Sequence, residues 1–346
     1  MKLLIFTRKV DRNDAVAGFS YWWVKAFAAE VETLDVLCLE QGDISGLPQN
    51  CRIHSLGKEK GNNRLQRLWL TLYYGRKLVA LADAVFTHQN PEYGLVLAPW
   101  CKLYRKPLIS WYVHKSVTWK LRWLNFLANK MVTASKESFR LASKKLVLLS
   151  HGIDTDLFSF LPQSRSEVLA IVSISRITKS KQLDKIVQVV SRLQQLGEKV
   201  TLDIYGQTVM PADEEYLQTL KTQIERDNLQ QIIQFKGPIA NNQTPQIYQQ
   251  SDLLINCSVT GSLDKGILEA MSCGTLVLTS NEAFKFFFKE VGLNLYADNE
   301  AALVDKIRQL IKLPDRRALQ TQLRKIVERE HNLESLVKKI IALYQL

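Results

Sequence analysis

Cysteine is scarce in this sequence, and its distribution argues against two classes of protein. The five cysteines are scattered along the chain, and no two of them form a C-x-x-C pair. This spacing argues against a disulfide framework and against a zinc site. Cys38 and Cys257 lie in apolar runs, as small buried side chains do. We therefore expect the protein in the reducing cytoplasm.

Long apolar runs are also missing. No window approaches the roughly 18 apolar residues that a membrane-spanning helix needs. The apolar residues near the start, Leu3–Phe6, soon meet Arg8 and Lys9. That run is too short for a signal peptide and is typical of a first β-strand. Any membrane contact is therefore expected to be peripheral.

What the sequence does have is an asymmetric charge. Its 346 residues suffice for two domains, and its net charge is +12. Residues 1–160 hold 23 Lys and Arg against 13 Asp and Glu, the remainder is almost balanced, and all seven tryptophans precede residue 124. This asymmetry predicts two domains with different partners. No nucleic-acid partner is expected, because no nucleic-acid-binding motif accompanies the basic residues.

Short apolar runs alternate with longer segments of helical period, which predicts parallel sheets joined by right-handed crossovers. The expected strands are Leu3–Thr7, Thr33–Leu39, Ala84–Thr87, Pro107–Tyr112, Met131–Thr133, Lys145–Leu149, Val168–Ser173, Val200–Tyr205, Ile232–Phe235, Leu253–Asn256 and Thr275–Thr279. The expected helices lie near 19–31, 62–82, 91–104, 116–128, 136–142, 181–196, 213–227, 244–250, 264–272, 299–312, 314–329 and 332–346. The fold class is therefore α/β.

The turn-rich segment Ser150–Ser166 interrupts this alternation and is interpreted as a linker. The last two helical patterns have no strand between them, so the end of the chain is expected to pack back across the first domain. The predicted boundaries are 1–155 for the first domain, 156–330 for the second and 331–346 for the returning helix. Ligands of such folds bind outside the carboxyl ends of the strands, so the informative residues should follow strands.

A basic segment, Ser175–Lys181, follows one expected strand and opens a helix. Arg176 and Lys181 combine a planar donor fork with a point charge, and a helix N-terminus adds free backbone N–H groups. This combination suits a diphosphate. The alternative is that both side chains are solvated surface charges.

A second candidate segment follows the strand that ends at Asn256 and is a glycine-bearing loop that leads into a short helix. Glycines in such a loop allow backbone to approach a phosphate closely. The alternative is that Asp264 only caps the helix and that Glu269 is solvated. However, a helix of this composition is mostly buried, and a buried glutamate needs a partner. The candidate residues of this segment are Gly261, Ser262, Asp264, Gly266 and Glu269.

Two histidines and one glycine also follow expected strands. His114 and His88 come directly after two strands of one sheet, and the alternative for each is an ordinary core or surface histidine. Gly18 lies at the turn between the first strand and the next helix, without a G-x-G-x-x-G fingerprint.

The order and spacing of four segments resemble the nucleotide-sugar glycosyltransferases of GT-B fold, specifically the large family 4 of retaining enzymes (glycosyl transferases group 1). His151–Asp154, followed by Phe158, resembles the family's linker signature. Ser175–Lys181 resembles its G-R-x-x-x-x-K segment, with serine in place of the glycine. The remaining segments are Phe235–Gly237, which resembles an F-x-G turn before the base pocket, and Leu268–Gly274, which is close to L-E-A-M-A-C-G.

The resemblance implies two Rossmann-like domains that face a central cleft, with the nucleotide-sugar donor held mainly by the second domain and the acceptor by the first. Arg176 and Lys181 would neutralise the diphosphate, Glu269 would hold the ribose, His114 would lie beside the transferred sugar, and Gly18 would face the phosphates. His114 and Glu269 are thus the candidate catalytic residues.

The same resemblance places His88 on the acceptor side. It implies no resident cofactor and no metal, and the sequence has no D-x-D motif. Cations and helix dipoles would stabilise the leaving nucleotide instead.

One position departs from the family's pattern. The family usually carries two glutamates eight residues apart; Glu269 matches the second, and Gly261 occupies the place of the first. Asp264 is near enough in sequence to be a candidate substitute.

The function expected from this resemblance is hexosyl transfer, with retention of configuration, from a nucleoside diphosphate sugar to a glycan or lipid-linked acceptor, as in cell-envelope polysaccharide biosynthesis. One alternative is a nucleotide-sugar 2-epimerase, which needs further carboxylates and histidines in the sugar pocket. Another is a non-catalytic relative that binds nucleotide sugars.

Aromatic and basic residues are interleaved in two helical segments of the first half. In residues 116–128, Trp119, Trp123 and Phe126 recur at spacings of four and three, beside Lys120 and Arg122. This is the pattern of a helix that lies on an anionic membrane surface. The alternative is that these aromatic residues are core stripes of helices that flank a sheet.

A second segment, Arg64–Lys77, combines four basic residues with Trp69, Tyr73 and Tyr74. An anionic membrane surface is therefore a candidate partner, and the expected location is the cytoplasm or the cytoplasmic face of a membrane.

Overall fold

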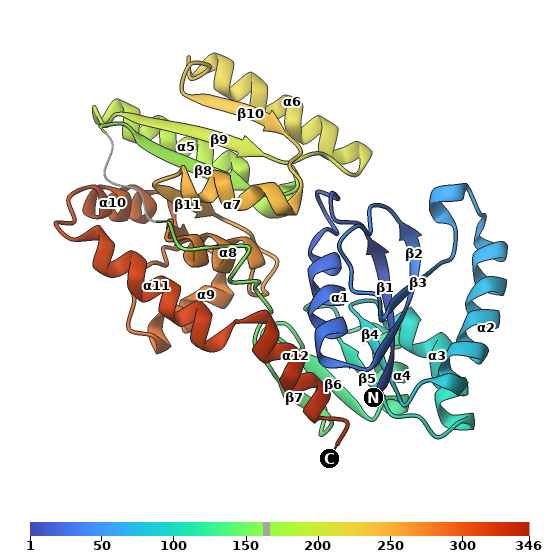
Figure 1. Ribbon diagram of the computed structural model, residues 1–346. Helices are drawn as coiled ribbons and strands as arrows, with labels where there is room; N and C mark the ends of the chain where they lie inside the picture. The colour runs from blue at the N-terminus through green and yellow to red at the C-terminus, as the bar shows by residue number, and fades with distance from the viewer. Residues whose placement is uncertain (162–166, 346) are drawn as a thin grey trace. The chain divides into compact units, whose positions relative to one another are not determined.

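The chain folds into two compact α/β units. The computed structural model describes residues 1–161 and 167–345. Unit 1 comprises Met1–Asp154, Ala240–Asn242 and Asn332–Leu346, and unit 2 comprises Thr155–Ile239 and Gln243–His331 (Figure 1). Part of the predicted linker, residues 162–166, lies outside the described residues.

Unit 1 is built on a seven-stranded parallel sheet in the order β3-β2-β1-β4-β5-β6-β7. Its strands are β1 (Lys2–Val10), β2 (Thr33–Gln41), β3 (Cys51–Ser55), β4 (Ala84–His88), β5 (Leu108–Trp111), β6 (Lys130–Thr133) and β7 (Leu146–Leu148). Strands such as β4 are buried along their whole length, because helices cover both faces of the sheet.

The helices of unit 1 lie on opposite faces of this sheet (Figure 1). The first face is covered by α1 (Phe19–Glu30) and α12 (Leu333–Ala342), and the second by α2 (Arg64–Leu81), α3 (Pro91–Leu103) and α4 (Trp119–Leu127). The C-terminal helix packs its buried leucines and isoleucine into the same core as α1. As the sequence predicts, the end of the chain completes the core of the first unit.

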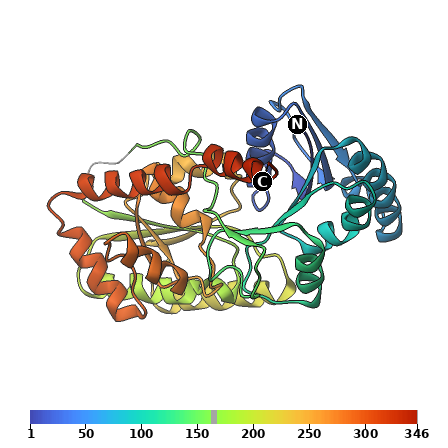
Figure 2. The same ribbon diagram turned by 90° about the horizontal axis from the view of Figure 1, so that it is seen from below.

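Unit 2 has a five-stranded parallel sheet in the order β10-β9-β8-β11-β12. Its strands are β8 (Leu169–Ile174), β9 (Val200–Tyr205), β10 (Ile233–Gly237), β11 (Leu253–Asn256) and β12 (Leu276–Thr279). Its helices are α5 (Leu183–Gln195), α6 (Pro211–Arg226), α7 (Thr244–Gln249), α8 (Lys265–Cys273), α9 (Glu282–Glu290), α10 (Glu300–Ile311) and α11 (Arg316–Glu330). Figure 2 shows the strands between a layer that contains α5 and a layer that contains α11.

The predicted helix over 136–142 is wrong, because this segment forms turns. The hydroxyl groups of Ser135 and Ser138 bond to each other at 2.9 Å, and the Ser138 carbonyl accepts a hydrogen bond from the backbone N–H of His114 at 2.9 Å. Serine side chains that compete for local hydrogen bonds disfavour a helix here. The structure also adds β3 and α9, which the sequence patterns did not predict.

Arg324 of α11 connects three segments of unit 2 by hydrogen bonds. Its guanidinium donates hydrogen bonds to the carbonyl oxygens of Phe158 at 2.6 Å, Ser272 at 3.0 Å and Thr155 at 3.0 Å. One side chain thereby joins α11 to the first residues of unit 2 and to α8.

We predict that Arg324→Met lowers the unfolding free energy of unit 2 by about 2 kcal/mol or more, because three part-buried carbonyl groups lose a charge-assisted donor. Calorimetric melting of the full chain measures this loss. Lys325→Met is the matched control, since Lys325 is the next residue of the same helix and is exposed. Equal melting temperatures for the two variants would contradict the role given to Arg324.

Candidate active site

The strand order of unit 2 places two candidate loops next to each other. From β8 the chain adds β9 and β10 on one side, and it returns to add β11 and β12 on the other. The loops that follow β8 and β11 therefore leave the sheet at its topological switch point, where parallel sheets bind ligands. The two predicted donor segments, Ser175–Lys181 and Gly261–Glu269, begin in these two loops, and the second continues into α8.

An ion pair and a backbone hydrogen bond join these loops. The Lys181 ammonium lies 2.5 Å from a carboxylate oxygen of Asp264, and the backbone N–H of Val259 donates to the carbonyl of Ser180 at 2.9 Å. Lys181 ends a short 3₁₀ turn, Lys179–Lys181, directly before α5. The structure thus brings together two predicted residues that are far apart in the sequence.

Asp264 is held by several groups of unit 2. Its carboxylate accepts hydrogen bonds from the Asn256 amide at 3.2 Å and from the backbone N–H of Gly266 at 3.3 Å, which caps α8. Burial by itself would raise the pKa of this carboxyl, but Lys181 and these hydrogen bonds more than offset burial and lower the pKa. Asp264 is therefore an ionised residue that caps α8 and orients Lys181. These contacts differ from the contact with the sugar that was expected if Asp264 replaced the missing glutamate.

Arg176 is exposed on the loop that follows β8. The loop is fixed by hydrogen bonds from the backbone N–H groups of Ser175 and Ile177 to the carbonyl oxygens of Tyr205 and Gln207, both at 3.0 Å. Its guanidinium therefore extends from an ordered backbone at the switch point.

Gly206 makes this loop arrangement sterically feasible, although it was not among the residues predicted from the sequence. Its φ of +145° is unfavourable for other residues, and a Cβ atom there would lie 1.8 Å from the Ser175 carbonyl oxygen. A glycine directly after the strand Val200–Tyr205 was the available signal.

Glu269 is buried on α8, with 8% of its surface exposed. Its charge acts on the phenol of Tyr248, on α7. Burial, together with the nearby charge of Glu269, raises the pKa of Tyr248 well above its usual range, so Tyr248 remains a protonated donor. The burial of Glu269 contradicts the alternative of a solvated carboxylate.

Lys265 lies one turn before Glu269 on the same helix, and it too was not among the predicted residues. Burial lowers the pKa of Lys265 to about 8, and the neighbouring Glu269 charge opposes that shift. The i, i+4 spacing of a lysine and a glutamate on an otherwise apolar helix was the signal for this pair.

The two candidate glycines of this loop have different structural roles. Gly261 has a φ of +66°, a left-handed conformation that favours glycine. A Cβ atom on Gly266 would lie 3.3 Å from the Tyr248 hydroxyl, so the glycine allows α8 to approach that side chain. Between them, the backbone carbonyl of Ser262 accepts a hydrogen bond from the buried Asn281 amide at 2.9 Å.

In unit 1, Gly18 and His88 flank the corresponding switch point between β1 and β4. A Cβ atom on Gly18 would lie 2.5 Å from the carbonyl oxygen of Asp14, so the turn before α1 requires glycine. His88 is buried: its ring stacks on Trp23 with centroids 4.7 Å apart, and its Nδ1 lies 3.2 Å from the Thr7 hydroxyl. His88 thus occupies a packed core position.

His114 is exposed on the loop that follows β5. Its Nδ1 accepts a hydrogen bond from the backbone N–H of Ser116 at 3.1 Å. The proton of the neutral ring therefore lies on Nε2, which can act as a donor. The turn segment that replaces the predicted helix over 136–142 holds this loop through Ser138.

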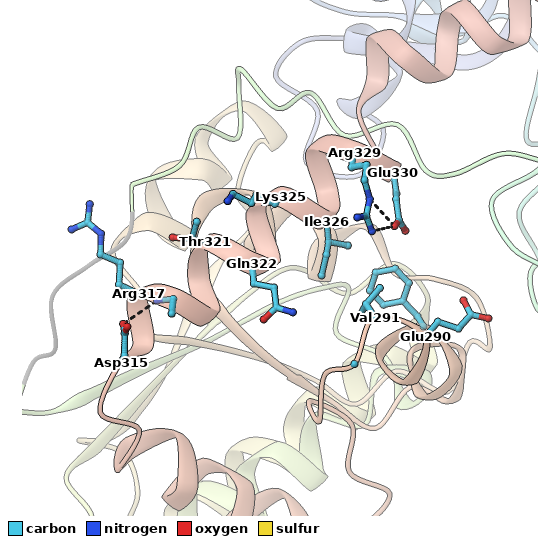
Figure 3. A pocket seen from close by; sticks show the side chains of 13 residues that line it. Glu290, Val291, Asp315, Arg317, Thr321, Gln322, Lys325, Ile326, Arg329 and Glu330 are labelled. Carbon is cyan, nitrogen blue, oxygen red and sulfur yellow. Dashed lines mark hydrogen bonds and ion pairs between the residues drawn. The ribbon is translucent and has the colours of Figure 1, made fainter.

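A cavity of about 1090 Å³ lies elsewhere in unit 2, between α9 and α11 (Figure 3). It is lined by Arg317, Lys325 and Arg329 together with three acidic residues, and Arg329 pairs with Glu330. None of the predicted site residues lines this cavity. It lies by the C-terminal end of α9, whereas ligands are expected at the carboxyl ends of strands, where α9 begins. Among the described residues, no group of three or more His, Cys, Asp or Glu side chains is arranged to hold a metal ion.

Comparisons with known proteins agree with this fold. The chain is similar in structure to HepE of Anabaena, solved in complex with UDP, with a TM-score of 0.78 and 16% identity over 100% of both chains. It is also similar to a glycosyltransferase of Rickettsia africae, with a TM-score of 0.77 and 17% identity over 99% of this chain and 97% of that chain. At these identities the likeness establishes the fold. It is the predicted GT-B fold, with two α/β units that each contain a parallel sheet.

A curated relative matches part of the sequence. It is a phosphatidylinositol N-acetylglucosaminyltransferase component from Arabidopsis thaliana, 25% identical over 143 residues, which is 40% of this chain and 30% of the relative's length. The family model of glycosyl transferases group 1 matches residues 158–332, just over half of the chain. The chain therefore belongs to the glycosyl transferases group 1 family.

Proposed function

We propose that this glycosyltransferase moves a hexose from a nucleoside diphosphate sugar to a glycan or lipid-linked acceptor, with retention of configuration and without a metal ion. The observation that carries the proposal is the meeting of Lys181, Asp264 and the glycine-bearing loop at the switch point of unit 2. The similar structures solved with UDP and the N-acetylglucosaminyltransferase relative support a nucleotide sugar as donor.

The side chains at the switch point can supply the charge that the donor requires. Arg176 and Lys181 together would neutralise the diphosphate as it departs, and backbone N–H groups of the loop that follows β11 would add donors. Glu269, near Tyr248, would accept hydrogen bonds from the ribose hydroxyl groups.

Few side chains are needed for the transfer of the sugar itself. In a front-face mechanism with retention, the departing phosphate takes the acceptor proton, so His114 need not act as a base. His114 would donate a hydrogen bond from Nε2 to the sugar and orient it. Gly261 leaves the place of the usual first glutamate without a carboxylate, and this difference would affect which sugar is accepted.

A panel of UDP, GDP and ADP, and of their sugars, tests the proposal by thermal shift. A nucleotide at 100 times its Kd stabilises the folded protein by about 2.7 kcal/mol. Hydrolysis of the stabilising donor, followed by product analysis for the anomeric configuration, then tests catalysis. Stabilisation without any hydrolysis or transfer would indicate a non-catalytic binding protein, and no stabilisation by any nucleotide would contradict the proposal.

We predict that Arg176→Ala and Lys181→Ala each weaken the binding of nucleoside diphosphate roughly 10- to 150-fold, the range for one lost charge-assisted hydrogen bond. Isothermal titration measures this. Lys179→Ala is the control, because Lys179 is exposed in the same turn.

The double variant Lys181→Ala/Asp264→Asn separates two causes of a weaker affinity. If Lys181 contacts phosphate, the double variant stays weak. If affinity returns to the wild-type value, the loss in Lys181→Ala came from the unpaired Asp264 charge, and the placement of the diphosphate is wrong.

For Glu269, we predict that Glu269→Gln lowers nucleotide affinity while the melting temperature of the free protein changes little. Glutamine keeps the shape of the side chain and an acceptor for Tyr248, but it loses the charge that strengthens a bond to the ribose. Titration and melting curves of the same sample distinguish binding from folding. A large drop in melting temperature with unchanged affinity would make Glu269 a structural residue.

His114 is expected to affect turnover more than binding. His114→Ala removes the Nε2 donor, so kcat should fall about tenfold, the value of one neutral hydrogen bond, while the Kd for free nucleotide stays the same. His114→Asn, which keeps a side-chain N–H donor, should recover part of the rate. Wild-type turnover in His114→Ala would show that His114 is an ordinary surface residue that does not contribute to the transfer.

A further inference from the structure

Helix α2 of unit 1 exposes an apolar stripe to solvent. Five large apolar or aromatic side chains that recur at helical spacings of three and four are exposed on it: Leu65, Leu68, Trp69, Leu72 and Tyr73. Another side of the helix carries Thr71, Gly75 and Leu78, which recur at spacings of four and three and are buried. The helix therefore has a second apolar face that the core of unit 1 does not use.

Helix α4 repeats this arrangement. Leu121 and Leu124 are buried, whereas Trp119, Trp123 and Phe126 are 65%, 56% and 70% exposed. The alternative of a core stripe, raised by the sequence, is thereby contradicted. Large aromatic side chains that are exposed on two helices of one layer are uncommon on a protein without a partner at that face.

A groove connects this exposed face to α3. It has a volume of about 790 Å³, and most of its lining is apolar and aromatic, from Trp69 and Tyr73 on α2 to Trp100 and Tyr104 at the end of α3. Arg76 and Lys77 also line it. The rings of Trp69 and Tyr73 are stacked, with centroids 5.7 Å apart. Helices α2, α3 and α4 cover one face of the sheet of unit 1.

The charge of this face has one sign. From residue 64 to residue 130 the chain carries eleven Lys and Arg, and its only acidic residues there are Asp83 and Glu92. Helices α2 and α4 contain no acidic residue at all. Glu92 is paired with Lys120 at 2.6 Å, so its charge is compensated.

We propose that the outward face of α2, α3 and α4 docks this protein on an anionic lipid bilayer. Trp and Tyr beside Lys and Arg match the interfacial zone of a membrane, where rings enter the boundary between headgroups and acyl chains and cations meet the headgroup charge. The excess of basic over acidic residues favours this occupant over a second copy of the chain, whose matching face would carry the same charge. No helix of the described residues is long and apolar enough to span a bilayer, so the contact is a surface contact.

Membrane docking does not depend on the donor chemistry of the proposed function, and vesicle binding is measured separately from nucleotide binding. Docking on a bilayer also indicates the class of acceptor, because an enzyme held at a membrane surface would act on an acceptor at that surface. The groove lies between α2 and the end of α3, and the exposed aromatic residues of α4 would widen the contact.

Sedimentation with vesicles of phosphatidylcholine, with or without phosphatidylglycerol, tests the proposal on the full chain. We expect binding to the anionic vesicles at low salt, and loss of binding at high salt or without phosphatidylglycerol. Arg76→Gln/Lys77→Gln should weaken the partition coefficient by about fivefold for each charge removed.

Trp69→Ser/Trp123→Ser should abolish sedimentation without changing nucleotide affinity, which also shows that the variant is folded. Phe286→Ser is the matched control, because Phe286 is an exposed aromatic residue on α9 of unit 2, and it should sediment like the wild type. Two results would overturn the proposal: no binding of the wild type to anionic vesicles at low salt, or unchanged binding of Trp69→Ser/Trp123→Ser. A stable wild-type dimer that these serine substitutions dissociate would also overturn it, since the face would then join two copies.

Discussion

The ion pair between Lys181 and Asp264 is the interaction on which the candidate site depends. The two residues are 83 positions apart in the sequence, and they meet because β8 and β11 are neighbours in a parallel sheet whose order reverses at that point. Asp264 also caps α8, the helix that carries Glu269. One carboxylate thus fixes a cation of the first loop and the start of the helix that follows the second loop.

The same constraint explains which kinds of side chain occupy the strand ends. Parallel strands expose their carboxyl ends at one edge, so loops there can bring together residues from distant segments. In unit 2, Gly206 follows β9 at a point where the backbone of the neighbouring loop approaches closely, and Gly266 on α8 lies next to the Tyr248 hydroxyl. In unit 1 the corresponding positions differ: Gly18 makes a tight turn, His88 is buried, and His114 remains exposed on the next loop.

The sequence predicted the α/β class because buried parallel strands read as short apolar runs, and Val200–Tyr205 and Leu253–Asn256 match the observed strands at both ends. The strand β3 was missed because it is a half-buried edge strand with polar residues. The helix α9 was missed because its phenylalanines are nearly consecutive and Phe286 faces solvent. Sequence reasoning identified Arg176, Lys181, Asp264 and Glu269 as candidates. The pairing of Lys181 with Asp264 and the place of Tyr248 near Glu269 depend on tertiary contacts that no local pattern contains.

Hydrogen–deuterium exchange of the full chain, with and without the nucleoside diphosphate that stabilises it most, tests the central claim most directly. If the donor is bound at the switch point of unit 2, peptides covering 175–182 and 261–269 should gain protection, and peptides of α2 in unit 1 should not change. The cavity between α9 and α11 is the competing location in the same unit. Protection confined to peptides of that cavity, with none in the loops that follow β8 and β11, would contradict the account.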